Sequence, residues 1–147
     1  MEPQAYEWTC SVCSCTWVLQ SVGIIDPTID QYTARYEVGN RMGYPKCVNE
    51  VYGCMSTQCV KDVFEAYGLK SDSAYVTFDQ AYAIMSATTG TINPQGMYHF
   101  MGIRGVNSDN VTLRVANSAV GYRGVYEEMN RSQFNSLGPV ELVYVVP

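Results

Sequence analysis

The stretch CSVCSCTWVLQSV, from Cys10 to Val22, decides the fold of this 147-residue chain. Its apolar residues recur at helical spacing, and Gly23 follows it directly, at a position where helices commonly end. Apolar residues occupy nearly the whole circumference of the predicted helix. The segment therefore predicts a helix buried in the centre of the molecule rather than one lying on its surface.

The rest of the chain predicts helices before Gly90 and strands after it. The further helices cover about Ile29 to Val38, Ser56 to Tyr67, and Thr77 or Asp79 to just before Gly90, with a loop from Gly39 to Gly53. The strands cover Met97–Val106, Val111–Ala116, Gly124–Met129 and Val140–Val146, with a hairpin turn at Asn107–Asn110 and a helical turn from Asn130 or Ser132 around Phe134. This order predicts an α+β domain in which N-terminal helices pack on a C-terminal antiparallel sheet.

Length and composition are those of one compact domain over residues 1–147, which we expect to be a monomer. Apolar residues make up 47% and charged residues 16%, which excludes disorder as the main state. The net charge of −5 argues against a nucleic-acid partner. No apolar run approaches the roughly 18 residues of a membrane span, and MEPQAYEW is not a signal peptide, so we expect no membrane partner and synthesis in a cytoplasm.

The chain contains six cysteines, at positions 10, 13, 15, 47, 54 and 59. Without a secretion signal there is little reason to expect disulfides. A zinc site would need a second close pair beside Cys10 and Cys13, whereas the last three cysteines lie seven and five positions apart. We therefore expect no metal and mostly buried, reduced thiols. A structural zinc or disulfide domain remains an alternative.

One histidine, His99, lies on the first strong strand. A lone histidine in an apolar strand is more often a buried core residue than a general base. Asn117, 18 positions later, falls close to His99 across the expected hairpin. Its side-chain carbonyl could accept the imidazole N–H, although Asn117 can equally be a turn residue ahead of Ser118.

A nucleophile is expected at a helix start, where the helix dipole and unpaired N–H groups stabilise a thiolate. Cys10 occupies that position, while Cys13 and Cys15 fall inside the helix. Gln4, six residues before Cys10, could donate its amide to an oxyanion together with the backbone N–H of Cys10. Gln4 can also belong to a frayed N-terminal tail.

Gln4, Cys10, His99 and Asn117 resemble the catalytic residues of papain-like cysteine peptidases in chain order and role. QAYEWTCSVCSCTWVL is similar to the opening of bacterial double-glycine leader peptidases, HFMGIRGV with VTLRVANSAVGYRG to their histidine strand and hairpin, and MNRSQFNSLGPVELVYVV to their closing turn and strand. More narrowly, CSVCSCTWVLQ, YPxCVN, MSTQC and NPQGxYHFMxIRGV resemble the peptidase modules of mycobacteriophage endolysins. The sequence has Cys10-Ser11 and Asn117-Ser118 where the family usually has Cys-Gly and Asp-Pro.

The resemblance implies a papain-like fold and a cysteine peptidase that needs no metal or organic cofactor. It implies Cys10 as nucleophile, His99 as general base, Asn117 as the group orienting His99, and Gln4 as an oxyanion donor. Trp8 and the Tyr98 flank are expected to line the substrate groove, whereas Trp17 is expected in the core.

The expected substrate is a stem or cross-link peptide of mycobacterial peptidoglycan. The chain would then be a module of a phage endolysin that is made in the host cytoplasm and acts on the cell wall. The alternatives are a peptidase that processes a leader or a phage protein, and a catalytically inactive wall-binding module with the same fold.

Overall fold

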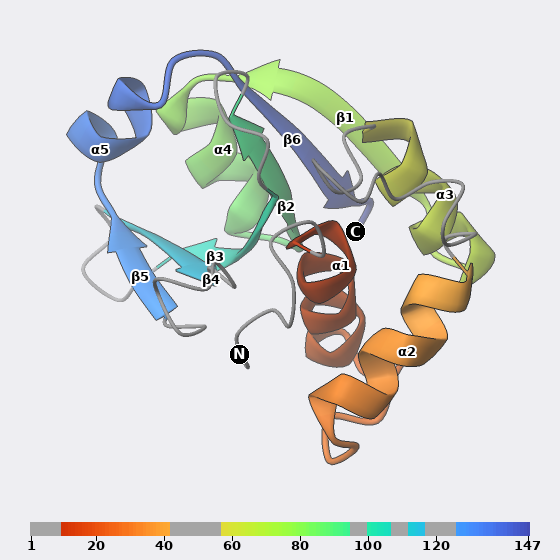
Figure 1. The fold of residues 1–147 in the computed structure, drawn as a ribbon. Coiled ribbons are helices and arrows are strands. Elements are labelled where there is room, and N and C mark those ends of the chain that lie inside the picture. The colour runs from red at the N-terminus through yellow and green to blue at the C-terminus, as the bar shows by residue number, and fades with distance from the viewer. Residues whose placement is uncertain (1–9, 42–56, 95–99, 107–111, 117–125) are drawn as a thin grey trace.

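The computed structural model of the chain describes residues 10–41, 57–94, 100–106, 112–116 and 126–147 (Figure 1). The described elements, in chain order, are α1 (Cys10–Ser21), α2 (Gln31–Arg41), α3 (Thr57–Ala66), β1 (Ser71–Val76), α4 (Phe78–Met85), β2 (Thr89–Pro94), β3 (Met101–Val106), β4 (Leu113–Ala116), β5 (Tyr126–Met129), α5 (Arg131–Ser136) and β6 (Val140–Val145). The strands form one antiparallel sheet in the order β1-β6-β2-β3-β4-β5. The predicted α+β class is confirmed.

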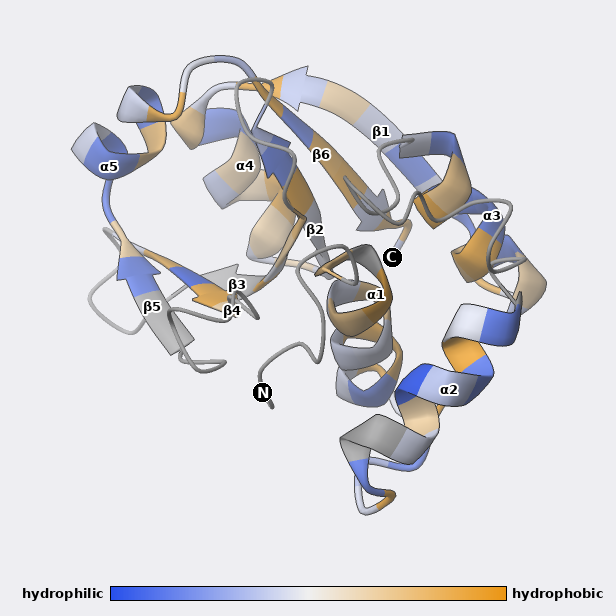
Figure 2. Cartoon of the chain, in the orientation of Figure 1, coloured by the Kyte–Doolittle hydropathy of each residue, from blue (hydrophilic) through white to orange (hydrophobic). Residues whose placement is uncertain are grey.

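Each face of the sheet carries its own hydrophobic core, because successive strand residues point to opposite faces. One core joins α1, α2 and α3 to residues such as Phe100, Ala116 and Val143, and Figure 1 shows these three helices side by side. The other core joins α4 and α5 to residues such as Ile103 and Leu142. Figure 2 shows the hydrophobic strand β6 beside the more hydrophilic edge strand β1.

Helix α1 is the buried central helix that the sequence predicts. Cys10 and all residues from 12 to 20 are buried, including Trp17. The helix carries hydroxyl groups into the core, and they are hydrogen-bonded. Thr16 Oγ1, for example, donates to the carbonyl of Val12 at 2.7 Å. Satisfied hydroxyls allow such a helix to be buried on all sides at little cost.

A glycine allows α1 to lie directly on β3. A Cβ atom added at Gly102 would stand 2.4 Å from Trp17 Cε3, well inside van der Waals contact. The indole of Trp17 therefore occupies the space where any other residue would place its side chain. This contact sets how closely the central helix approaches β3.

The two short helices of the second half begin with capping boxes. Thr77 Oγ1 accepts from the backbone N–H of Gln80, and Gln80 Oε1 accepts in return from the N–H of Thr77. Asn130 and Gln133 form the same reciprocal pair at α5. The structure thus selects Thr77 and Asn130 from the alternative start residues that the sequence allowed.

Strands β1 and β2 are missing from the prediction, and α2 is longer than predicted. The sequence of β1, SDSAYV, is polar because it lies at the sheet edge, and that of β2, TGTINP, contains glycine and proline, which are unfavourable in strands. The predicted loop start Gly39–Arg41 is the last turn of α2. Gly39 is not among the described glycines with positive φ, so its backbone does not adopt the conformation in which glycine ends a helix.

Several predicted boundaries differ by one or two residues, as is usual at element ends. Helix α1 ends at Ser21 rather than Val22, α2 begins at Gln31 rather than Ile29, and β6 ends at Val145 rather than Val146. The prediction that the fourth helix continues to just before Gly90 is wrong, because α4 ends at Met85 and β2 begins at Thr89. Strand β3 begins at Met101, after Phe100. The rest of the predicted loop from 42 to 53, the strand positions 97–99, 111 and 124–125, and the turn at 107–110 lie outside the described residues.

An exposed ion pair joins α4 to α5. Arg131 Nη2 donates to Asp79 Oδ1 at 2.7 Å, and the guanidinium also lies 4.9 Å above the Phe78 ring. The hydrogen bond from Arg131 lowers the pKa of Asp79 below its ordinary value. Because the pKa is lowered in the folded state, the pair stabilises the fold above the unfolded-state pKa and loses that effect as pH falls through the folded value.

We predict that Gly102→Ala lowers the free energy of unfolding by about 1–3 kcal/mol, because the new methyl group meets the buried indole of Trp17. Gly39→Ala is the matched control. Its methyl group fits at 3.9 Å from Val12, and a helical alanine should raise stability by about 0.5–1 kcal/mol. Urea unfolding followed by circular dichroism measures both. A Gly102→Ala protein as stable as the wild type would contradict the contact.

We also predict that Arg131→Gln returns the pKa of Asp79 upward toward its ordinary value, because the principal cause of its depression is removed. The pKa of Asp26 is lowered by the backbone N–H of Thr28 and then by its hydroxyl, so it should stay lowered in the same variant. Carbon-13 NMR titration of the two carboxyl groups compares them within one sample. An unchanged Asp79 titration would show that the pair does not persist in solution.

Candidate active site

Cys10 is the first residue of α1, as predicted, and its side chain is fully buried. The N–H groups of the first turn of a helix have no partner within the helix, and the dipole makes that end electropositive. A thiol at this position therefore lies where a negative charge is most easily accommodated. The local sequence places it there because the apolar helical pattern begins at Cys10.

The backbone of Phe100 contacts the sulfur of Cys10. The backbone N–H of Phe100 donates to Cys10 Sγ at 3.3 Å. The carbonyl of the same residue accepts a hydrogen bond of 3.0 Å from Ser14 Oγ. The side chains of Cys10, Ser14 and Phe100 are all buried. Side chains in the first turns of α1 thus form hydrogen bonds with both the N–H and the carbonyl of Phe100.

The strand partner of β3 brings a second predicted site position toward this region. Strands β3 and β4 pair antiparallel, as predicted, with Gly102 opposite Ala116 and Ile103 opposite Val115. The register shifts before Val106, which lies opposite Leu113, so the pairing is not that of the predicted four-residue turn. Ala116 also belongs to the same hydrophobic core as Cys10 and Phe100. The residues that adjoin His99 and Asn117 in the chain, Phe100 and Ala116, therefore lie together in the core that surrounds Cys10.

Gln4, Trp8, Tyr98, His99 and Asn117 lie outside the described residues. Their roles as oxyanion donor, groove residues, general base and orienting amide stay predictions. Cys10 is the predicted site residue that the structure describes.

Sequence reasoning did not identify Ser14 or the backbone of Phe100 as part of the site. A signal for Ser14 was present. It follows Cys10 by four residues, which places both side chains on one face of the helix. Nothing in the sequence alone indicated that this face would meet Phe100.

The other described cysteines, Cys13, Cys15 and Cys59, are buried, which confirms that part of the expectation. Cys47 and Cys54 lie outside the described residues. Across the described ranges, no cluster of three or more histidine, cysteine, aspartate or glutamate side chains could hold a metal ion. The same part of the chain contains no helix of the length and apolarity needed to span a membrane.

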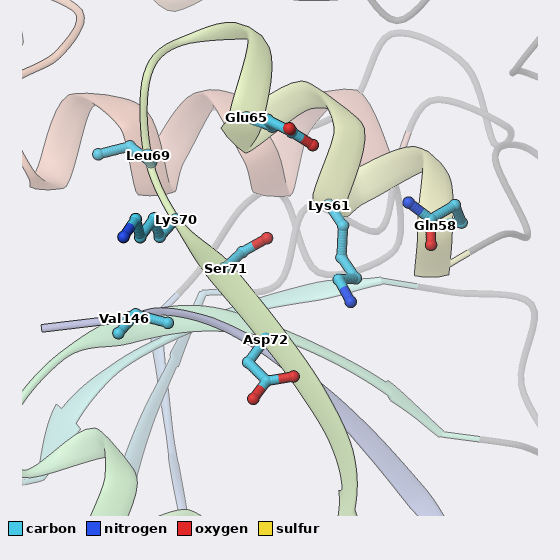
Figure 3. Close-up of a pocket in the computed structure, with 8 residues that line it drawn as sticks. All are labelled: Gln58, Lys61, Glu65, Leu69, Lys70, Ser71, Asp72 and Val146. Atoms are coloured by element: carbon cyan, nitrogen blue, oxygen red, sulfur yellow. The ribbon is translucent and has the colours of Figure 1, made fainter.

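A pocket of about 430 Å³ lies between α3 and the edge strand β1 (Figure 3). Its lining carries both signs of charge, including Lys61, Glu65 and Asp72, and Figure 3 shows Lys61 pointing toward β1. Strand β1 is separated from β3 by β6 and β2. Neither Cys10 nor Phe100 lines the pocket, so it is not the candidate active site.

No protein-family model and no curated protein matches the sequence. Solved structures match it over nearly its whole length. A double-glycine-motif protease of an AMS/PCAT transporter, solved in complex with the leader peptide, has a TM-score of 0.68 at 13% identity and covers 99% of this chain and 89% of that chain. The peptidase domain of Streptococcus ComA, a bifunctional ABC transporter involved in quorum sensing, has a TM-score of 0.69 at 13% identity, covering 99% and 96%.

A third match is a protein from Bacillus anthracis described as a C39-like peptidase, with a TM-score of 0.61 at 13% identity, covering 100% of this chain and 94% of that chain. These matches confirm the predicted papain-like fold and agree with a resemblance to the double-glycine leader peptidase type. They do not bear on the narrower resemblance to phage endolysins. At these identities the comparison establishes one conclusion: the chain has the papain-like α+β fold of C39-like peptidase domains.

Proposed function

We propose that this chain is a cysteine peptidase with Cys10 as its nucleophile. The observation that carries the proposal is the hydrogen bond from the Phe100 amide to Cys10 Sγ, at the start of a buried helix. That amide nitrogen belongs to the peptide bond that joins His99 to Phe100. Consecutive Cα atoms lie about 3.8 Å apart, so the single histidine of the chain is joined directly to a residue in contact with the candidate nucleophile.

The proposed reaction uses residues of this chain alone. The Cys10 thiolate attacks the carbonyl carbon of the scissile peptide bond and forms a tetrahedral oxyanion, which the Cys10 N–H and the Gln4 amide stabilise. The imidazolium of His99 gives its proton to the leaving nitrogen as the C–N bond breaks, and a thioester remains on Cys10. His99 then takes a proton from water, which attacks the thioester, and the Cys10 sulfur leaves. Asn117 accepts the second imidazole N–H and keeps the ring oriented.

For the substrate, we propose a peptide that is cut at a processing site. Support comes from a structural neighbour that was solved with the leader peptide bound. Trp8 and Tyr98 are the groove residues proposed to contact the peptide.

The second candidate substrate is the stem peptide of bacterial peptidoglycan, cut by the chain as a module of a phage endolysin that is made in the host cytoplasm. The segments CSVCSCTWVLQ and NPQGMYHFMGIRGV favour it, because they resemble endolysin peptidase modules. In both cases Cys10 is the nucleophile, and the two candidates differ in the substrate bond that is cut.

We predict that Cys10→Ala and His99→Ala each lower the rate of peptide hydrolysis by at least about 1,000-fold, because each removes a member of a group that acts as a unit. Cys15→Ala is the matched control, since it removes a buried thiol from the same helix and should keep the rate within about threefold. New amino termini released from a peptide library measure the rate. Hydrolysis at the wild-type rate by folded Cys10→Ala or His99→Ala would disprove the mechanism.

The two candidate substrates can be compared with one preparation of the protein. We expect cleavage of a leader-type peptide that ends in Gly-Gly, detected by mass spectrometry, and loss of that cleavage in Cys10→Ala. Release of stem-peptide fragments from purified mycobacterial peptidoglycan, without cleavage of the Gly-Gly peptide, would instead establish the wall-lytic role. Sedimentation with peptidoglycan without cleavage of either substrate would identify a catalytically inactive binding module.

A further inference from the structure

We infer that Ser14 is a positioning residue of this site, which holds the segment carrying His99 against the first turns of α1. The inference rests on the proposed function, because it concerns the distance between His99 and Cys10. Ser14 does not touch the reacting atoms in this account. Its hydroxyl acts through the backbone of Phe100, to which it donates a hydrogen bond of 3.0 Å.

The geometry of Phe100 gives Ser14 this role. The N–H of Phe100 is bonded to Cys10 Sγ and its carbonyl to Ser14 Oγ, so two bonds fix this residue on one helix face. The N–H belongs to the peptide group that joins His99 to Phe100, and the carbonyl belongs to the group that joins Phe100 to Met101. Bonds to side chains one helical turn apart therefore hold the peptide groups on both sides of the Phe100 Cα against the helix.

The hydrogen-bond partner of Ser14 differs in kind from those of Thr16 and Ser21 in the same helix. A serine or threonine inside a helix commonly donates to the carbonyl four residues earlier. Thr16 and Ser21 in α1 do so, bonding the carbonyls of Val12 and Trp17 at 2.7 Å each. Ser14 instead bonds a residue 86 positions away in the chain. Its hydroxyl is therefore used for a long-range contact between α1 and the segment before β3.

The contact matters most in the second half of the proposed reaction. When Cys10 carries the acyl group, its sulfur is a thioester and no longer the thiolate that accepts strongly from the Phe100 N–H. The bond from Ser14 to the Phe100 carbonyl does not change with the state of Cys10. It is then the remaining bond of the pair that keeps His99 positioned to activate water for deacylation.

The test compares Ser14→Ala with Thr16→Val, a matched control that removes a fully buried hydroxyl bonded only within the helix. We expect Ser14→Ala to lower kcat about 10- to 100-fold, because misplacing a catalytic group costs this much rate, and to lower KM with it, because deacylation then limits turnover and leaves kcat/KM nearly unchanged. Intact mass spectrometry should show acyl-enzyme accumulating in Ser14→Ala during turnover. Thr16→Val should keep kcat within about twofold and accumulate none.

A second readout needs no activity. Because the chain has one histidine, the imidazole signals in a carbon–proton NMR spectrum belong to His99. They should move in Ser14→Ala and in Cys10→Ala, and stay in place in Thr16→Val. The amide of Phe100 should also exchange with deuterium faster in Ser14→Ala than in the wild type.

The outcomes separate this inference from the proposed function. An active wild type whose Ser14→Ala variant keeps kcat and the His99 signals would overturn the role of Ser14 and leave the peptidase standing. An inactive wild type in which Ser14→Ala still moves the His99 signals would overturn the peptidase and leave the positioning contact standing. If Ser14→Ala does not fold, Ser14→Cys keeps the shape with a much weaker donor. A folded Ser14→Cys protein with the kcat of the wild type would overturn the inference.

Discussion

Helix α1 can lie directly on β3 because Gly102 leaves room for the indole of Trp17, and the other contacts of the site follow from this approach. With the helix this close, Ser14 reaches the carbonyl of Phe100 and the Cys10 sulfur reaches its N–H. Residues 10, 14 and 17 recur at helical spacing, so the same face of α1 makes all three contacts. The stability of the fold and the geometry of the candidate site therefore depend on one helix–strand interface.

Burying α1 on all sides places polar groups in the core, and the structure satisfies them in two ways. Thr16 donates to a carbonyl of its own helix, so its hydrogen bond does not connect α1 to another element. Ser14 and Cys10 bond outside it, and so connect the N-terminal half of the chain to the sheet of the C-terminal half. The peptidase domains that match this fold are only 13% identical to the chain in sequence.

The central helix, its first residue and the β3–β4 hairpin could be predicted because each has a strong local signal. Cys10 begins an apolar helical run, and the strands of β3 and β4 are apolar on both sides of a polar turn. Strands β1 and β2 could not be predicted, because their partner β6 lies at the other end of the chain and their own sequences are polar or contain glycine and proline. The hydrogen bond between Ser14 and Phe100 could not be predicted from the sequence either, because only the tertiary fold brings these residues together.

The most direct test of the account is the reactivity of the six cysteines toward iodoacetamide at mildly acidic pH, followed by mass spectrometry. Ordinary thiols, with a pKa of about 8.5, react slowly there, whereas a thiolate stabilised by an imidazolium reacts rapidly. We expect fast labelling of Cys10 alone, and loss of that labelling in His99→Ala. Slow and equal labelling of all six cysteines would contradict it, because the chain would then have the fold of a peptidase without an activated nucleophile.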